Sequence, residues 1–370
     1  MRFNDKQYQW YILNEFVTRV SRKNVNNISI LPLTISAQYG LVDQISFFNK
    51  TVASKDMSGY YLLKNGEFAY NKSYSKDYPW GAIKRLDLYD MGCLSTLYIC
   101  FKCNKSIVDS NYLVHYFEST KWHRQVSNIA GEGARNHGLL NIAVNDFFNT
   151  KHAIPPIENQ KKIAKFLDLI EEKIQTQIKI ISDHTSLKEG IYNLMFKENH
   201  AEFKLKELAN IVKGKQINND QLLSNGFYYM MNGGTSPSGY LNSYNVLENT
   251  ISVSEGGNSC GYVQFNNSKF WSGGHCYTIQ DVNSILVDNK YLYHYLKYKE
   301  KELMNLRIGT GLPNIQKKDL ENFMISVPSL LIQRKNLALL EMLDKKKCIL
   351  NKELQCLERQ KKYLLCNMFI

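Results

Sequence analysis

Two stretches of the chain carry a repeating apolar pattern that predicts long helices. The apolar residues of the first stretch, residues 154–196, follow alternating four-and-three spacing: Ile163, Leu167, Ile170, Ile174, Ile181 and Ile191. The second stretch, residues 327–370, repeats that spacing: Leu340, Leu343, Leu350, Leu354, Leu357, Leu364 and Met368. A heptad seam needs a partner helix, so each stretch is expected to pair with the other. Polar residues interrupt the first seam: Gln177, His184 and Lys188.

The chain also repeats itself. Residues 154–196 align without a gap to residues 327–369 at an offset of 173, with nine identities in 43 positions. Pro155 matches Pro328 and Gln160 matches Gln333 at the starts, and Met195-Phe196 matches Met368-Phe369 at the ends. A proline near the start suits a helix, because the first N–H groups have no partner within the helix. A weaker repeat precedes each helix, where "LNEFV" resembles "LKELA" (residues 13–17 and 205–209).

The remaining sequence has the character of two globular regions. Both contain short strand-like runs, such as "GEFAY", "TISVS" and "GYVQF", and both close with helical stretches, "NYLVHYFEST" and "NKYLYHYLKYKEKELMNL". The Gly-rich "SEGGNSCG" and "NGGTSPSG" lack the order of a phosphate-binding loop and are interpreted as turns between strands. The predicted fold class is α+β: two α/β domains separated by two long antiparallel coiled-coil helices with pseudo-twofold symmetry. The predicted boundaries are 1–153, 154–196, 197–326 and 327–370.

Composition narrows the function. Of the 370 residues 44% are hydrophobic and 22% charged, which excludes a mostly disordered chain. The net charge of +12 favours a polyanionic partner, nucleic acid first. That charge is uneven, with +6 on residues 1–153 and only +1 on residues 197–326. No stretch is apolar enough to span a membrane and the N-terminus lacks the pattern of a secretion signal, so a cytoplasmic location is expected.

The eight cysteines are expected to be reduced. Cys100 and Cys103 form a C-x-x-C, and with Cys93 and His115 they leave a zinc site open as an alternative. The flanking "LSTLYICFKCN" favours the end of an apolar strand instead. Cys260 and Cys276 are interpreted as small core residues, and His275, next to Cys276, as a core histidine rather than a catalytic one.

Several segments resemble the DNA-specificity subunits of type I restriction–modification systems. The most specific are "IPPIENQKKIAKFLD" at the start of the first helix and "RIGTGLPNIQKKDLENFMISVP" before the second. "FWSGGHCYTI", "NKYLYHYLK" and "GEGARNHGLLNIAVNDFF" are similar to parts of the family's recognition domains, and the resemblance covers nearly the whole chain. The chain departs from the family at Ser95-Thr96, where Ser-Pro is common. It departs again at "VPSLLIQRK", where the family usually has Pro-Pro and Glu-Gln.

The resemblance implies a subunit with two target-recognition domains and no catalytic activity or cofactor of its own. A partner modification subunit would carry S-adenosylmethionine and methylate adenine, and a motor-nuclease restriction subunit would cleave unmarked DNA. Two such modification subunits are expected to dock on the helices. About 37 helical residues span roughly 55 Å, or about 16 base pairs, so the expected target is two short segments separated by a spacer. Because the two globular regions differ in sequence, that bipartite target should be asymmetric.

Three loops combine basic, amide and small residues and are the candidate DNA contacts. Arginine can pair with guanine and asparagine with adenine, and glycine permits close approach of the backbone. The loop "GEGARNHG" provides Arg135, Asn136 and His137, and "RIGTGLPN", at the equivalent place before the second helix, provides Arg307, Thr310, Gly311 and Asn314. "VKGKQIN" provides Lys213, Lys215 and Gln216. Each loop could instead be a tight turn with a solvated cation.

Two other functions remain open. An autonomous modifying enzyme would need a Gly-rich cofactor loop and an Asn/Asp-Pro-Pro-aromatic motif, whereas the one Pro-Pro here lies between Ile154 and Ile157. A coiled-coil adaptor that binds RNA or protein would fit the helical repeat, and the 24 tyrosines could stack on RNA bases. The helices keep additional apolar residues outside the seam, and Phe166 and Leu169 are the predicted docking residues for the modification subunit.

Overall fold

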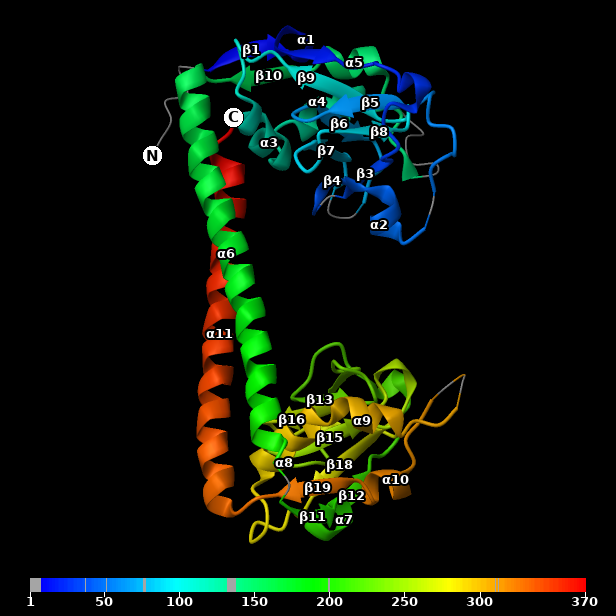
Figure 1. Ribbon diagram of the computed structural model, residues 1–370, viewed down its shortest axis with the longest axis vertical. Helices are drawn as coiled ribbons and strands as arrows, with labels where there is room; N and C mark the ends of the chain where they lie inside the picture. The colour runs from blue at the N-terminus through cyan, green and yellow to red at the C-terminus, as the bar shows by residue number, and fades with distance from the viewer. Residues whose placement is uncertain are drawn as a thin grey trace. The chain divides into compact units, whose positions relative to one another are not determined.

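The computed structural model describes residues 8–36, 38–50, 52–75, 78–131, 138–198, 200–309, 311 and 313–370. The chain forms two compact units. Unit 1 comprises residues 1–178 and 352–370, and unit 2 comprises residues 179–351. Each unit therefore contains one globular region and part of both long helices, α6 (Ile157–Phe196) and α11 (Leu330–Asn367) (Figure 1). The four-part division by residues 1–153, 154–196, 197–326 and 327–370 stays a prediction about functional boundaries.

The globular part of unit 1 is a mixed α/β region. Its strands are β1 (Gln9–Ile12), β2 (Val17–Arg19), β3 (Leu33–Ser36), β4 (Gly40–Asp43), β5 (Tyr61–Lys64), β6 (Phe68–Asn71), β7 (Ala82–Arg85), β8 (Met91–Leu94), β9 (Ile99–Cys103) and β10 (Lys151–Ile154). Its helices are α1 (Leu13–Phe16), α2 (Gln44–Phe48), α3 (Ser110–Glu118), α4 (His123–Ile129) and α5 (Val144–Phe148), with a 3-10 turn at Val25–Asn27.

The globular part of unit 2 is built from a similar set. Its strands are β11 (Ala201–Lys204), β12 (Asn210–Lys213), β13 (Tyr228–Met231), β14 (Gly239–Leu241), β15 (Thr250–Ser254), β16 (Val263–Asn266), β17 (Trp271–Ser272), β18 (Cys276–Gln280) and β19 (Met324–Val327). Its helices are α7 (Leu205–Leu208), α8 (Asn289–Tyr298), α9 (Glu300–Asn305) and α10 (Lys317–Glu321), with 3-10 turns at Asn219–Gln221 and Gly257–Ser259. As predicted, the two Gly-rich segments connect strands, β13 to β14 and β15 to β16.

The two units share one sheet topology. The main sheet runs β2-β9-β6-β7 in unit 1 and β12-β18-β15-β16 in unit 2, with every described pair antiparallel. In each unit the first and last strands of the globular region pair antiparallel as a two-stranded ribbon, β1 with β10 and β11 with β19. The short helix after the first ribbon strand also repeats, because the Ile12 N–H donates to Glu15 and the Lys204 N–H to Glu207. The weak sequence repeat before each long helix is therefore confirmed.

A buried glutamine links each long helix to its globular region. The Gln160 carboxamide accepts the Asp109 N–H at 2.7 Å and donates to the carbonyls of Ile107 and Pro155. Gln333 repeats all three bonds, accepting from Asp288 and donating to Leu286 and Pro328. Asp109 and Asp288 cap α3 and α8, so each glutamine joins the start of a long helix to the start of a domain helix. The change to "VPSLLIQRK" in the second copy leaves these contacts intact.

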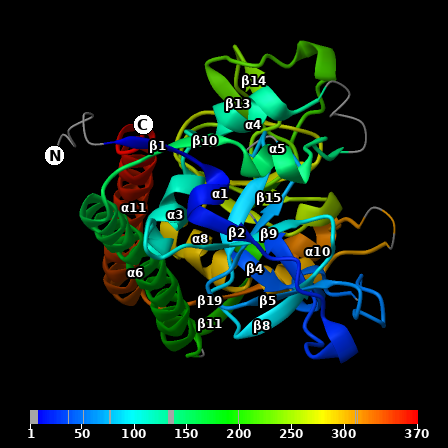
Figure 2. The ribbon, with the colours of Figure 1, turned by 90° about the horizontal axis from the view of Figure 1, so that it is seen from above.

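The heptad seams are confirmed within each unit, where α6 and α11 lie side by side and antiparallel (Figures 1 and 2). In unit 1, Ile163, Leu167 and Ile174 are buried, and Leu340 and Leu350 are buried in unit 2. Two of the polar seam residues have partners on the opposite helix. Gln177 donates to Glu353 at 3.1 Å in unit 1, and Lys188 pairs with Asp344 at 2.5 Å in unit 2.

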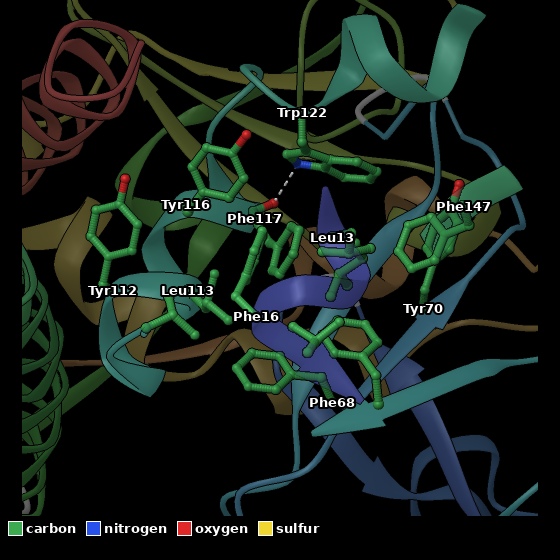
Figure 3. Packing of buried hydrophobic residues seen from close by; sticks show 14 of the residues in the cluster. Leu13, Phe16, Phe68, Tyr70, Tyr112, Leu113, Tyr116, Phe117, Trp122 and Phe147 are labelled. Carbon is green, nitrogen blue, oxygen red and sulfur yellow. Dashed lines mark hydrogen bonds between the residues drawn. The ribbon is translucent and has the colours of Figure 1, made fainter. Parts of the chain in front are cut away.

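The core of unit 1 is dominated by aromatic rings (Figure 3). Phe68 stacks on Phe101 with ring centroids 5.3 Å apart, and Tyr70 stacks on Phe147 at 5.0 Å. Trp122 is 1% exposed and donates its indole N–H to the Phe117 carbonyl. This core packs the main sheet of unit 1 against its helices.

The phenylalanine of each repeated Met-Phe pair anchors the last turn of a long helix in the core of a globular region. Phe369 packs in unit 1 against Tyr112 and Tyr116, with centroids at 5.4 and 5.7 Å. Phe196 packs in unit 2 against Tyr291 and Tyr295, both at 5.5 Å. The end of the second helix therefore completes the core around α3, and the end of the first completes the core around α8. The predicted α+β class with long coiled-coil helices is confirmed.

Candidate nucleic-acid interface

The two predicted Gly-flanked loops leave their domains from equivalent points. In unit 1 the Tyr74 N–H donates to Gly138 and the Leu140 N–H to Lys72. In unit 2 the Gly257 N–H donates to Pro313 and the Ile315 N–H to Glu255. Each loop thus ends by pairing with the chain that follows the same central strand, β6 in unit 1 and β15 in unit 2.

The loop side chains are only partly described. Arg135, Asn136, His137 and Thr310 lie outside the described residues. Arg307, Gly311 and Asn314 are exposed, and Asn314 pairs with Ile308 by two backbone hydrogen bonds that close the loop. Their contact with DNA stays a prediction.

The third candidate segment follows β12. Lys215 and Gln216 are exposed, and the Lys215 backbone carbonyl accepts the indole N–H of Trp271. Gln216 lies against Gly274, where an added Cβ would come within 2.5 Å of the Gln216 Oε1. Glycine at position 274 therefore permits the close approach of the two segments, and DNA contact by these residues stays a prediction.

Lys213 is not a solitary surface cation. Its Nζ lies 2.7 Å from the Oε1 of Glu255, a carboxylate that is 8% exposed and follows β15. The Tyr277 hydroxyl donates to the same oxygen at 3.1 Å, while Oε2 is buried with no hydrogen bond. Burial, together with the nearby Glu255 charge, raises the pKa of Tyr277 well above its usual range, so its hydroxyl remains a donor.

The structure corrects the interpretation of His275. Its side chain is 65% exposed rather than buried, and its Nδ1 lies 3.9 Å from the Oε2 of Glu255. Cys276, the next residue and the first of β18, is 2% exposed, as predicted, whereas His275 lies in the turn before that strand. Glu255 and His275 were missed as site residues. The available signals were an acidic residue directly after an apolar strand, in "TISVSEGG", and a histidine after two glycines, in "SGGHC".

The predicted docking residues are exposed. Phe166 is 44% and Leu169 is 48% exposed on α6, although both are large and apolar. The offset of 173 places Leu339 and Met342 at the matching positions of α11, and they are 37% and 64% exposed. Each unit therefore presents one apolar pair on its long helix.

The cysteines do not gather into a metal site within the described part of the chain. Cys93 and Cys100 are buried in β8 and β9, and the Cys93 thiol donates to the Ser29 carbonyl. Burial raises the pKa of Cys100 to about 12, which favours the thiol over the thiolate that binds metal. Among the described residues, no helix is both long and apolar enough to cross a bilayer.

Comparison with known proteins points to one family. Residues 197–359 match the family model of the type I restriction modification DNA specificity domain. A protein of Mycoplasma pneumoniae assigned as a type I specificity subunit is 34% identical over 121 residues, which is 33% of this chain and 32% of that protein. The match thus spans about a third of that relative. A type I restriction enzyme specificity subunit of Methanocaldococcus jannaschii is 26% identical over 74% of this chain and 72% of its own length.

Solved structures agree on the fold along the whole chain. The type I restriction–modification S subunit from M. genitalium superposes with a TM-score of 0.63 at 16% identity, covering 100% of this chain and 98% of that one. A chain from a study of complex assembly and conformational transition of the type I system gives 0.65 at 18% identity, covering 97% and 96%. These comparisons do not support the alternative of a coiled-coil adaptor that binds RNA or protein. The chain is therefore similar to the DNA-specificity subunits of type I restriction–modification systems, in sequence over residues 197–359 and in fold along its whole length.

Proposed function

We propose that this chain is the sequence-specific DNA-binding subunit of a type I restriction–modification complex. The observation that supports the proposal is that the two units share one framework of sheet, ribbon and helix cap but differ in the elements added to it. Both units keep the same main sheet, the same ribbon and the same glutamine cap. Unit 1 adds β3, β4, α2, β5 and β8, whereas unit 2 adds β13, β14 and β17. Unlike additions on a common scaffold suit two different base-reading surfaces, and hence an asymmetric bipartite target.

The chain itself is proposed to be non-catalytic. S-adenosylmethionine would be bound by the modification subunit, which would methylate adenine where this chain directs it. A restriction subunit would join the same complex to cleave unmarked DNA. In this arrangement the specificity subunit supplies base contacts, while phosphate contacts supply the salt-dependent part of the affinity.

The direct test is methylome sequencing of cells that express this chain with the modification subunit encoded beside it. A new asymmetric bipartite adenine mark is the expected result. The control is the modification subunit expressed alone, which should leave no such mark. A soluble complex that produces no mark in cells and binds no duplex in vitro would contradict the proposal.

The exposed apolar pairs are the proposed docking sites for two modification subunits, one on each unit. Burying a pair such as Phe166 and Leu169 would remove apolar surface from water, which is the main driving force for association. Replacing both with Asp should reduce the complex from two modification subunits to one, as measured by mass photometry. Replacing Leu339 and Met342 should do the same, and the fourfold variant should lose both.

Leu187 provides the matched control for this experiment. It is 55% exposed on α6, but its counterpart in the repeat is the polar Gln360. Leu187→Asp should therefore leave the stoichiometry unchanged. An unchanged stoichiometry in the Phe166 and Leu169 variant would exclude that pair as a docking site.

A further inference from the structure

We propose that Lys213 and His275 form a binding site for one backbone phosphate of the DNA duplex, and that Glu255 is the positioning residue for both. The inference rests on the proposed DNA-binding function and identifies a subsite within unit 2. The three side chains come from separate segments of the main sheet: the end of β12, the residue after β15 and the residue before β18.

The backbone beneath this cluster is fixed. The His275 N–H donates to the Asn232 side chain at 3.1 Å, and the His275 carbonyl accepts the Glu255 N–H at 3.0 Å. Lys213 pairs with Tyr277 in the strand ladder. Gly233 has a φ of +83°, and a Cβ there would lie 3.0 Å from the His275 carbonyl oxygen. Exposed side chains on a rigid backbone are pre-organised for a ligand.

The Glu255 carboxylate faces the two basic side chains with different oxygens. Oε1 accepts from Lys213 and from the Tyr277 hydroxyl. Oε2 is buried without a hydrogen bond, and the His275 Nδ1 lies 3.9 Å from it. An unsatisfied buried carboxylate oxygen is unfavourable, so a small movement of His275 toward it would be favourable.

The outward-facing donors suit a phosphate. The Lys213 ammonium has three N–H donors, and its side chain is 53% exposed beyond the bond to Glu255. The His275 imidazole carries a ring N–H donor, and its side chain is 65% exposed. Phosphate oxygens accept such charge-assisted bonds. The exposed Lys215, two residues along the chain, adds further positive charge. The subsite compensates for the net charge of only +1 on residues 197–326.

The first test measures the affinity of the complete complex for two DNA duplexes over a series of NaCl concentrations. One duplex contains the target sequence identified by methylome sequencing, and the other has an unrelated sequence. Lys213→Ala and His275→Ala should each weaken binding to both duplexes about equally, by roughly 5–10-fold. Lys213→Ala should also lower the slope of log K against log [salt] by about 0.9. Lys206→Ala is the matched control. Lys206 is an exposed lysine of α7, at the opposite end of β12, and its removal should leave affinity for both duplexes unchanged.

The second test asks whether substitution of Glu255 strengthens or weakens DNA binding. Removing a negative charge near DNA should by itself tighten binding. Glu255→Gln should instead weaken binding about as much as the lysine variant, because Lys213 and His275 lose their anchor. Glu255→Asp, which keeps the charge on a shorter side chain, should also weaken it. Thermal unfolding of each variant checks that the fold is retained.

The outcomes separate this inference from the proposed function. Tighter binding by Glu255→Gln, or unchanged binding by both alanine variants, would overturn the subsite while the function stands. A loss confined to the site-bearing duplex would assign His275 to a base and overturn the phosphate assignment. A wild-type complex that binds neither duplex would overturn the function itself.

Discussion

At the scale of single residues, two glutamines are the most informative positions. Gln160 and Gln333 are 1% and 0% exposed, and each satisfies three backbone groups near the junction of a long helix with its domain. The sequence repeat marked both residues, but only the structure shows what they bind. Their shared contacts explain why this position is retained while the surrounding residues change.

Replacing either glutamine with alanine should destabilise its own unit. Gln160→Ala leaves the Asp109 N–H and the Ile107 and Pro155 carbonyls unpaired, at a cost of about 2–4 kcal/mol. Urea unfolding would measure the loss. Gln175→Ala is the control, because Gln175 is exposed and bonds only to Glu171 among the contacts described, and it should cost less than about 0.5 kcal/mol. Equal effects from the two variants would refute the role given to Gln160.

Two buried histidines should make stability depend on pH. Burial lowers the pKa of His152 to about 4, and burial together with the Lys188 charge lowers the pKa of His294 to about 4. The unfolded chain takes up these protons near pH 6.5 and the folded chain does not. Stability is therefore complete above about pH 6.5 and falls as the pH drops toward 4, by roughly 2–3 kcal/mol for each histidine.

Melting temperatures measured between pH 7 and pH 4.5 would test this dependence. In His294→Gln the decrease should be shallower than in the wild type, even if the variant is less stable at pH 7. His152 bonds to Tyr116 and Thr150, so His152→Gln should also flatten the curve, through unit 1. Parallel curves for wild type and both variants would argue against the buried neutral imidazoles.

At the scale of elements, the helix ends are as informative as the seam. The heptad pattern predicted that α6 and α11 pair, but not that their last residues enter the domain cores. Phe369 is 2% and Phe196 is 6% exposed, and each packs against two tyrosines of a domain helix. Each domain is completed by the end of the long helix that does not start from it.

Truncating these rings should loosen specific elements. Phe369→Ala should cost about 3–5 kcal/mol and increase hydrogen exchange in α3, whereas Phe196→Ala should do so in α8. Leu194→Ala, at a residue that is 77% exposed, should change neither. Exchange that rises equally in both domain helices for either variant would contradict the separate assignment of the two ends.

An ion pair between the helices allows a milder test of their pairing. Lys361 lies 2.6 Å from Glu171 in unit 1, and both side chains are partly exposed. Lys361→Glu should destabilise the chain by about 0.5–1 kcal/mol, and the exchanged pair Lys361→Glu with Glu171→Lys should recover most of it. A double-mutant cycle with no coupling energy would mean that the pair adds nothing to the alignment of the helices.

At the scale of the whole molecule, the two domains should act as separate reading units. Exchanging residues 197–326 for the corresponding segment of another specificity subunit should change one half of the methylated sequence and preserve the other half. Methylome sequencing of the chimera gives the result. Changes in both halves would show that each half-site is read jointly.

The spacing between the half-sites stays a prediction from helix length. An α-helix rises about 1.5 Å per residue, so seven residues added to each long helix would lengthen it by roughly 10 Å, or about three base pairs. The expected outcome is a longer unspecified spacer with unchanged half-sites. A methylated sequence with the original spacer would show that helix length does not set the distance between the half-sites.

The sequence by itself determined the elements with strong periodicity. A seam repeated every three or four residues, in two aligned copies, predicts two paired helices regardless of what surrounds them, because the apolar stripe must be buried. The family resemblance led to the proposed function, and its two most specific motifs lie at or just before the starts of these helices. Lys213 and the Gly-flanked loops were nominated by residue type alone, which identifies chemistry but not partners.

Only the tertiary structure decided which of these residues meet. Glu255 and His275 are 20 residues apart in the sequence. The sequence predicts a core position for His275 because its neighbour Cys276 is a core residue. His275 lies in the turn before β18, outside the strand, so the burial of Cys276 says little about it. The burial of a carboxylate between Lys213, Tyr277 and His275 depends on three strands brought together by the sheet. No local pattern encodes such a contact.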